Sequence, residues 1–223
     1  MIKANDYQKY FLDGDKHVGD YETMYRNCAD PWHIEELGLR LDMKAALLLW
    51  EHSPVKLDRA LDAGAGAGLF TLELLKVLKK TSPEVRLTVS DVAPSALALA
   101  KARLETAGEG ARVDYVPYDL RRLDESDGPF EAGAYDLIVV AQVLWGLLEN
   151  IRAVWAGLGR LARRGGRLLV AQHFPDPQNY GADVVGGPDD LARLIAEAGW
   201  RPLAALETDR RTNHHWTAMW SWN

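Results

Sequence analysis

Short apolar runs alternate with amphipathic segments along most of the chain, and this alternation predicts a layered α/β fold. The apolar runs are rich in Leu, Val and Ile and are bounded by turn residues, which is the pattern of β-strands. Seven such strands are expected, over residues 59–62, 85–90, 112–116, 135–140, 167–172, 202–207 and 214–222. Between them apolar residues recur every three or four positions, as on the buried face of a helix. These helices are expected over residues 69–80, 94–105, 148–163 and 189–198.

The connections predict a mostly parallel sheet with one antiparallel edge. Strands joined through a helix run parallel, and the helices then cover both faces of the sheet. Between Glu207 and His214 there is no room for a helical crossover, so the last two strands are expected to form an antiparallel hairpin. In the last strand Trp216, Trp220 and Trp222 share one face because their spacing is even. Burial under an edge helix, a dimer contact and an aromatic substrate wall all fit this pattern.

The N-terminal part of the chain is polar and aromatic and lacks this alternation. Short helices and a turn are expected there, followed by a helix over residues 36–52 that Ser53-Pro54 ends. We expect residues 1–52 to form a helical lid over a ligand-binding domain at 53–223, since lids exclude water and complete a pocket. Ordinary packing of a helical extension is the alternative. The aromatic residues that would face the ligand are Tyr21, Tyr25 and Trp32.

Composition narrows the class of protein. The 223 residues are 48% hydrophobic and carry 26 basic and 32 acidic side chains, a net charge of −6, which suits one globular domain and argues against a nucleic-acid partner. Cys28 is the only cysteine and no histidine pair has metal-ligand spacing, so neither a disulfide nor a metal is expected. The first ten residues lack a signal-peptide core and no window is apolar enough to span a bilayer, so we expect a cytoplasmic protein without membrane contact.

The strongest chemical signal is residues 61–68, Leu-Asp-Ala-Gly-Ala-Gly-Ala-Gly, between a strand and a helix. Glycines at 64, 66 and 68 remove Cβ atoms and let the backbone approach a ligand closely. Asp62, at the end of the strand, suits a ligand that carries an ammonium group. The spacing is not the G-x-G-x-x-G of a dinucleotide site, which disfavours an NAD-linked oxidoreductase. A tight turn without a ligand is the alternative.

Two further strand ends carry candidate groups at the same edge of the sheet, where ligands of open α/β sheets bind. Asp91 ends the second strand and could accept both hydrogen bonds of a ribose diol, or could cap the helix that starts near Pro94. His173 ends the fifth strand, and imidazole, whose ordinary pKa is about 6.5, suits proton removal near neutral pH. A hydrogen-bonded structural histidine is the alternative.

An acidic residue followed by Gly-x-Gly-x-Gly is the fingerprint of the class I S-adenosylmethionine-dependent methyltransferases, and the chain resembles them. Residues 29–32 (Ala-Asp-Pro-Trp), 88–96 and 136–145 further resemble the nodulation N-methyltransferase group, which methylates the free amine of a deacetylated chitooligosaccharide. The similarity covers most of the chain. Gln142 stands where that group tends to have Glu, and Trp145 where it tends to have Tyr, so the oligosaccharide substrate does not carry over.

The resemblance implies a Rossmann-like fold, S-adenosylmethionine as cofactor with S-adenosylhomocysteine as product, and a small-molecule acceptor methylated on nitrogen or oxygen. It implies that an acid after the third strand contacts adenine and that the exit of the fourth strand lies near the methyl group. The cofactor-binding residues are then Asp62, Gly64, Gly66, Gly68, Asp91, Val92, Asp119, Leu120, Gln142 and Trp32. The residues at the acceptor are His173 and Gln142 as catalytic groups, and Trp145, Tyr21, Tyr25 and Tyr180 as substrate-binding groups.

Several alternatives stay open at this point. Trp145 could be an ordinary core residue. The same scaffold could perform another reaction with S-adenosylmethionine, such as cyclisation or decarboxylation, or could bind the cofactor without turnover and serve a partner. A monomer and a homodimer are both compatible with the sequence.

Overall fold

The computed structural model describes residues 7–14, 16–124, 128–208 and 213–223, so most of the segment used above to exclude a signal peptide lies outside it. Its main sheet has seven strands in the order β5-β4-β3-β6-β7-β9-β8. All seven predicted strands are confirmed, with small changes at their ends and a longer fifth strand. Their bounds are β3 Arg59–Ala63, β4 Arg86–Asp91, β5 Val113–Pro117, β6 Tyr135–Ala141, β7 Ala162–Pro175, β8 Arg201–Glu207 and β9 Asn213–Ser221.

Strands β3 to β7 run parallel, and β9 lies antiparallel between β7 and β8. The predicted hairpin of the last two strands is therefore confirmed, with the last strand inserted inside the sheet rather than at its edge. In this register His173 of β7 lies directly opposite His215 of β9. Strand β3 comes first along the chain among the strands of this sheet and is central in it. The strand order therefore changes direction beside β3, and this is where open α/β sheets bind ligands.

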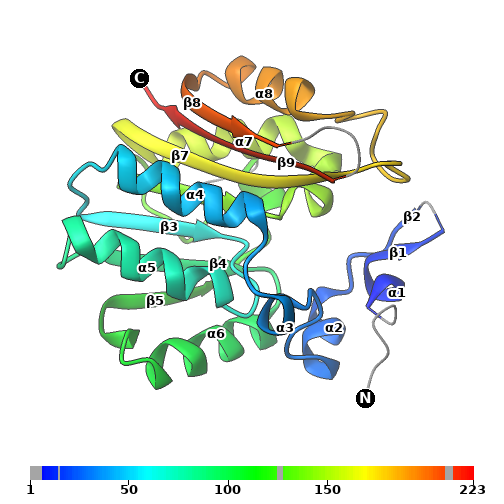
Figure 1. Cartoon of the computed structure of the whole chain (residues 1–223), viewed down its shortest axis with the longest axis horizontal. Coiled ribbons are helices and arrows are strands. Elements are labelled where there is room, and N and C mark those ends of the chain that lie inside the picture. Colours follow the sequence, from blue (N-terminus) through cyan, green and yellow to red (C-terminus); the bar gives the residue numbers. More distant parts are fainter. Residues whose placement is uncertain (1–6, 15, 125–127, 209–212) are drawn as a thin grey trace.

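Helices cover both faces of the sheet, as predicted (Figure 1). On one face the apolar side chains of three helices pack against the sheet; these are α4 Leu41–His52, α5 Leu69–Thr81 and α6 Pro94–Thr106. On the other face lie two helices, α7 Ile151–Leu161 and α8 Pro188–Glu197. Four short 3-10 segments connect these elements, at Gly110–Arg112, Leu120–Asp124, Leu144–Gly146 and Leu148–Asn150. In the described part of the chain no helix combines the length and apolarity that a membrane crossing requires.

The two faces of β9 carry different side chains. Trp216 and Trp220 are buried on the face covered by α7 and α8, and Trp222 packs partly against the same cluster. Of the three interpretations, this supports burial, because Trp216 and Trp220 have little exposed surface with which to contact a substrate or a second subunit. Met219, on the opposite face, packs in the cluster to which α4 contributes.

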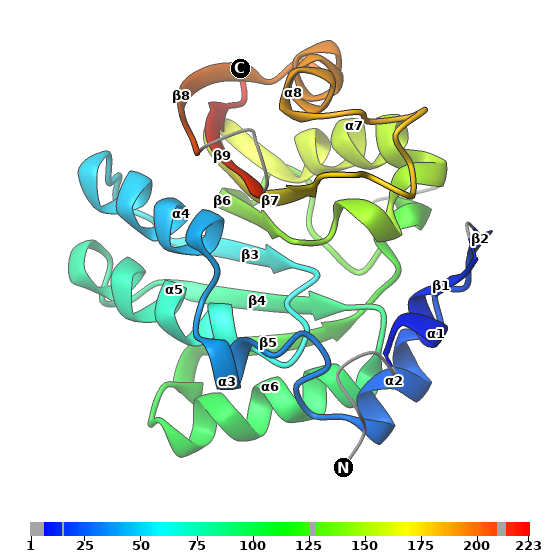
Figure 2. The same ribbon diagram turned by 45° about the vertical axis from the view of Figure 1, so that its right-hand side comes forward.

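The N-terminal elements, except the short helix at Ile34–Leu37, lie beyond the carboxyl end of β4 (Figure 2). They are α1 Gln8–Phe11, the small hairpin of β1 Leu12–Asp13 and β2 Lys16–His17, α2 Tyr21–Asn27 and α3 Ile34–Leu37. The helix predicted from residue 36 begins only at Leu41, because Gly38 adopts a φ of 78° and ends α3. Helix α4 packs on β7 and β9 and so belongs to the helical layer of the sheet. The lid division at residue 52 stays a prediction.

One carboxylate fastens the N-terminal elements to the sheet domain. Glu22 of α2 accepts hydrogen bonds from the backbone N–H of Ser95 at 3.0 Å and from its hydroxyl at 2.9 Å. Ser95 lies in the first turn of α6, where backbone N–H groups lack intrahelical partners, and the residue that caps this helix, Ala93, offers no side-chain acceptor. The bond from the Ser95 backbone is the main reason that the pKa of Glu22 is lowered.

Candidate active site

A cavity of about 250 Å³ lies between the carboxyl ends of the parallel strands and the N-terminal elements. It brings together most of the residues that the sequence singled out, although they come from widely separated segments. The predicted residues that line it are Tyr21, Tyr25, Trp32, Asp62, Gly64, Gly66, Asp91, Val92, Asp119, Leu120, Gln142, Trp145 and His173. Gly68 and Tyr180 are not among its described lining residues.

The loop between β3 and α5, residues 64–68, leaves no room for side chains at its first two glycines. Both Gly64 and Gly66 have positive φ; a Cβ on Gly64 would collide with Val143, and one on Gly66 would come within 2.5 Å of the hydroxyl of Tyr25. Gly68 differs, because a Cβ there would meet Ala100 of α6 at 2.7 Å. The structure therefore gives Gly68 a role in helix packing, where the sequence had suggested contact with a cofactor.

Asp62 is a buried carboxylate on the cavity wall. It is 1% exposed, and its oxygen Oδ2 accepts a hydrogen bond from the hydroxyl of Thr71 at 2.6 Å. Burial raises the pKa of Asp62 to about 6, because a charged carboxylate loses water that one neutral hydroxyl does not replace. The negative charge of Asp91 acts in the same direction, and the bond from Thr71 opposes it. A cation in the cavity would relieve this cost.

Asp91 holds the glycine loop and the start of α6 together. Its oxygen Oδ2 accepts from the backbone N–H of Gly66 at 2.8 Å, and Oδ1 accepts from that of Ala93 at 3.0 Å. Burial raises the pKa of Asp91, and these backbone bonds oppose the shift. The capping alternative is thus partly right, since Ala93 precedes the first turn of α6. A carboxylate oxygen can accept more than one hydrogen bond, so Asp91 also keeps capacity for a ligand.

Asp119 lies at the mouth of the cavity and is paired with Arg121, which also lines it. The guanidinium donates to both carboxylate oxygens, with the shortest bond 2.7 Å from Nη2 to Oδ2. Burial alone would raise the pKa of Asp119, but the bonds and the charge of Arg121 outweigh it and lower the pKa. Asp119 therefore stays ionised and offers its remaining acceptor capacity to the cavity.

Aromatic side chains of the N-terminal elements close the cavity on the side of the glycine loop. Tyr25 is buried against Gly66, and its hydroxyl accepts a hydrogen bond from the indole of Trp32 at 2.9 Å. Tyr25, expected at the acceptor, thus lies at the glycine loop. The hydroxyl of Tyr21 lies within hydrogen-bond distance of His17 Nε2, at 3.1 Å. Tyr180 stacks on His17 outside the cavity lining. Burial raises the pKa of Tyr21 and Tyr25, so both phenols stay neutral.

Gln142, Trp145 and His173 line the opposite end of the cavity, where the sequence placed the methyl acceptor. Trp145 packs edge-on against Phe174 while facing the cavity, so it is partly a core residue and partly a wall. Gln142 follows β6 with a φ of 60°, an uncommon conformation for a residue other than glycine, and its backbone N–H donates to Ala171 at 2.8 Å.

The sequence reasoning missed the residue that lies behind this end. Asp42 of α4 is buried, and its carboxylate contacts His215 Nδ1 at 2.6 Å and accepts from the carboxamide nitrogen Nε2 of Gln142. The ring of His215 lies 4.9 Å from that of His173, centroid to centroid. A usable signal was present, because Asp42 lies four residues before the buried Ala46, and a carboxylate on the apolar face of a helix is rare without a partner.

In the described ranges no group of three or more His, Cys, Asp or Glu side chains could hold a metal ion. The carboxylates Asp62, Asp91 and Asp119 of the cavity instead form pairs with neighbouring side chains or backbone amides. Their arrangement suits an organic ligand with a cation near Asp62 and hydrogen-bond donors near Asp91 and Asp119. S-adenosylmethionine carries such groups, and the glycine loop provides the close backbone approach that a nucleoside ligand needs.

The comparisons with known proteins agree with this geometry. Residues 61–168 match the family model of a methyltransferase domain. Nodulation protein S of Sinorhizobium fredii is 30% identical over 139 residues, which are 61% of this chain and 57% of that protein. The ubiquinone biosynthesis O-methyltransferase of Nitrosococcus oceani is 27% identical over 184 residues, 75% of this chain and 71% of that protein. The chain thus matches little more than half the length of the nodulation protein.

Among solved structures, the N-methyltransferase NodS from Bradyrhizobium japonicum WM9 in complex with S-adenosyl-L-homocysteine has the same fold. The TM-score is 0.69 at 20% sequence identity, over 90% of this chain and 97% of that chain. The fold and the cavity therefore define a Rossmann-like methyltransferase scaffold. The sequence matches make the chain similar to methyltransferases, over residues 61–168 for the family model and over longer stretches for single relatives, and the nodulation group is one of those that it resembles. The predicted resemblance to the methyltransferases is confirmed.

Proposed function

We propose that the protein transfers the methyl group of S-adenosylmethionine to a nitrogen or oxygen atom of a small molecule. The observation that carries this proposal is that one cavity is lined by the glycine loop, by the buried Asp62 and by the acceptor-end groups Gln142 and His173. Relatives named for N-methylation and for O-methylation both match the chain, so their names support both acceptor atoms.

The cofactor end of the cavity fits S-adenosylmethionine by the chemistry of its residues. Asp62 would pair with the ammonium group of the amino-acid part, which would remove the cost of burying that carboxylate. Asp91 would accept hydrogen bonds from the ribose hydroxyls. Asp119 and Leu120 would lie at the adenine, and Tyr25 with Trp32 would cover the glycine loop and exclude water. When bound, the cofactor supplies an activated methyl group whose transfer leaves the electron pair of the broken bond on sulfur.

At the acceptor end the chain supplies position and a place for a proton. Trp145 and Met43 offer apolar walls, and Gln142 can hold the acceptor but cannot deprotonate it. His173 would take the proton that the acceptor nitrogen or oxygen releases as its lone pair forms the new bond to carbon. Holding the two reactants in line can contribute several kcal/mol, up to roughly 7–11, which is the main catalytic effect expected here.

Two measurements test the proposal. Calorimetry should detect binding of S-adenosylhomocysteine and no binding of NAD; the reverse result would remove the assignment of the cofactor end. Transfer of an isotope-labelled methyl group into a panel of small amines and alcohols should then yield labelled product. Tight cofactor binding with no labelled product over a broad panel would instead favour a binding protein without turnover.

A further inference from the structure

A buried carboxylate that the proposed reaction does not use lies directly behind the acceptor end of the cavity. The side chain of Asp42 has no exposed surface, and its two oxygens contact different partners, Oδ1 the Nδ1 atom of His215 and Oδ2 the Nε2 atom of Gln142. We call these three side chains the Asp42 cluster. The hydroxyl of Thr217 also donates to the backbone carbonyl of Asp42 at 2.7 Å, which fixes the start of α4 to β9.

The Asp42 cluster determines which atom of Gln142 a ligand can reach. An ionised carboxylate only accepts hydrogen bonds, so the carboxamide must turn its nitrogen toward Asp42 and its oxygen away. In the described part of the chain no group donates a hydrogen bond to this oxygen, Oε1. The oxygen is also not a buried atom without a partner, so it must be accessible. Because Gln142 lines the cavity, Oε1 is therefore an open hydrogen-bond acceptor at the acceptor end.

The backbone of Gln142 points to the same conclusion. Its φ of 60° lies in the left-handed region, which costs an ordinary residue on the order of 1 kcal/mol or more. Strain of this kind persists where surrounding contacts over-determine a conformation, and such sites are often functional. A glycine would relieve the strain at this turn but would lose the bond to Asp42. The turn thus carries a side chain whose position depends on Asp42.

Asp42 also holds the ring behind the predicted base. A carboxylate can accept a hydrogen bond from His215 Nδ1 only when that nitrogen carries a hydrogen. The contact therefore favours the form of the ring in which Nδ1 is the donor. His215 lies opposite His173 in the pairing of β7 with β9, and the two rings are adjacent. The positions of both acceptor-end groups, Gln142 directly and His173 through its neighbour, are therefore tied to one buried side chain.

We propose that Asp42 is a positioning residue of the acceptor site, which presents Gln142 Oε1 as a fixed hydrogen-bond acceptor and so selects acceptors whose methylated atom still carries a hydrogen. Amines and hydroxyl compounds fit this site. A carboxylate acceptor makes no such bond, because it cannot donate to Gln142 Oε1. Any attraction for a carboxylate here would come from Arg40, which also lines the cavity and whose Nε lies 3.8 Å from Asp42 Oδ1. This inference rests on the proposed methyl transfer, since it describes the acceptor for that reaction.

The test uses three small probes of similar shape, benzylamine, benzyl alcohol and benzoate, bound to the protein in complex with S-adenosylhomocysteine. Ligand-observed NMR should show that Gln142→Leu weakens the two donor probes but not benzoate, which cannot donate a hydrogen bond to Oε1. Asp42→Asn and Gln142→Leu should each weaken the donor probes about fivefold to tenfold, the usual worth of one hydrogen bond. Glu51→Gln, an acid-to-amide change at the exposed far end of α4, is the matched control and should change nothing.

The double variant Asp42→Asn/Gln142→Glu exchanges donor and acceptor across the same contact. It should recover benzyl alcohol binding to within about twofold of the unaltered protein, because the amide at position 42 can donate to the carboxylate at position 142, whose other oxygen still accepts from the hydroxyl. Benzyl alcohol is neutral, so the added negative charge does not by itself attract it. A purely structural role for Asp42 would not predict this rescue. If Asp42→Asn does not fold, Gln142→Leu and the shift of the Gln142 carboxamide resonances on adding benzylamine carry the test.

Three results would overturn the inference. They are an equal loss of benzoate and benzylamine affinity in Gln142→Leu, no binding of either donor probe to the unaltered protein, and unchanged benzylamine affinity in a folded Asp42→Asn or Gln142→Leu variant. Failure of the proposed function looks different, because it appears as lost or absent binding of S-adenosylhomocysteine before any probe is added. Asp42→Asn and Glu51→Gln should keep that affinity within about twofold, since neither position lines the cavity. The probe affinities of Gln142→Leu are compared at the S-adenosylhomocysteine affinity measured for that variant.

Discussion

The replacement Asp62→Asn is expected to stabilise the protein in the absence of cofactor while weakening cofactor binding. The carboxylate is buried, has one side-chain hydrogen-bond donor in Thr71, and lies near the negative Asp91. An asparagine keeps the shape and can still accept the hydrogen bond from Thr71, but it carries no charge to desolvate. The ammonium group of S-adenosylmethionine would compensate the charge of Asp62, so the same change removes a partner from the bound state.

The magnitude follows from the pKa of Asp62, which burial raises from 3.8 to about 6. Because the folded pKa is the higher one, the folded protein holds a proton that the unfolded chain has released between these values. The stability of the unaltered protein therefore falls as pH rises through this window. At 1.36 kcal/mol per pH unit the loss is about 3 kcal/mol above pH 7, or about 6–12 °C in Tm for a domain of this size.

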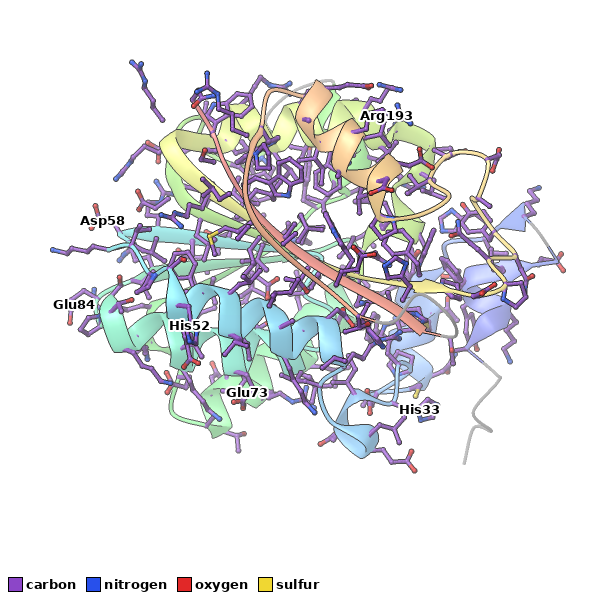
Figure 3. The ribbon with its side chains drawn as sticks, turned by 45° about the horizontal axis from the view of Figure 1, so that its top comes forward. His33, His52, Asp58, Glu73, Glu84 and Arg193 are labelled. Atoms are coloured by element: carbon purple, nitrogen blue, oxygen red, sulfur yellow. The ribbon has the colours of Figure 1, made fainter. Side chains whose placement is uncertain are left out.

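Urea unfolding from pH 4 to pH 8 measures this difference. The stability of Asp62→Asn minus that of the unaltered protein should be below about 1 kcal/mol at pH 4 and should reach about 3 kcal/mol above pH 7. Asp58→Asn is the control, because Asp58 lies at the periphery of the molecule (Figure 3) and is exposed. A difference that does not grow with pH, or an Asp62→Asn variant less stable at pH 7.5, would refute the reasoning. Affinity for S-adenosylhomocysteine should fall at least tenfold.

Three further variants test the cavity. Asp91→Ala should weaken S-adenosylhomocysteine binding about tenfold or more in calorimetry, because the glycine loop and the ribose lose an acceptor; unchanged affinity in a folded variant would place the ribose elsewhere. Gly66→Ala should abolish that binding, since its Cβ meets the Tyr25 hydroxyl at 2.5 Å, whereas Gly108→Ala, with a similar φ and open space, should leave it intact. His173→Ala should lower the rate of methyl transfer at nearly constant cofactor affinity, and an unchanged rate would exclude a base role.

The fold was largely predictable because its signals are local. Seven apolar runs separated by amphipathic segments or a short loop determine the strands, and chain length between them determines parallel or antiparallel pairing. Element ends were less predictable, since they depend on single residues such as Gly38, which delays α4 to Leu41. The position of β9 between β7 and β8 confirmed the hairpin but could not follow from spacing alone, because either strand of a hairpin can lie inside a sheet.

The cofactor end was also predictable, since a short motif carries it. Asp62 and the first two glycines share one strand-to-helix turn, and Asp91 ends the neighbouring strand. Gly68 shows the limit of motif reasoning, because its place in the pattern suggested a ligand contact while its neighbours in space are side chains of α6. Tyr25, in α2, and Tyr180, in the loop between β7 and α8, show the same limit, because no periodic pattern indicates which part of the cavity an aromatic ring in these segments will contact.

By itself the sequence determined the class of fold, the resemblance to the methyltransferases and the edge of the sheet at which the cavity lies, because each of these depends on residues close together in the chain. Only the tertiary structure decided what lies behind the acceptor. Asp42 and His215 are 173 positions apart, and their contact at 2.6 Å exists because α4 packs over β9. The packing of distant elements depends on how well their whole faces fit each other. No local sequence pattern indicates which polar groups will meet as a result.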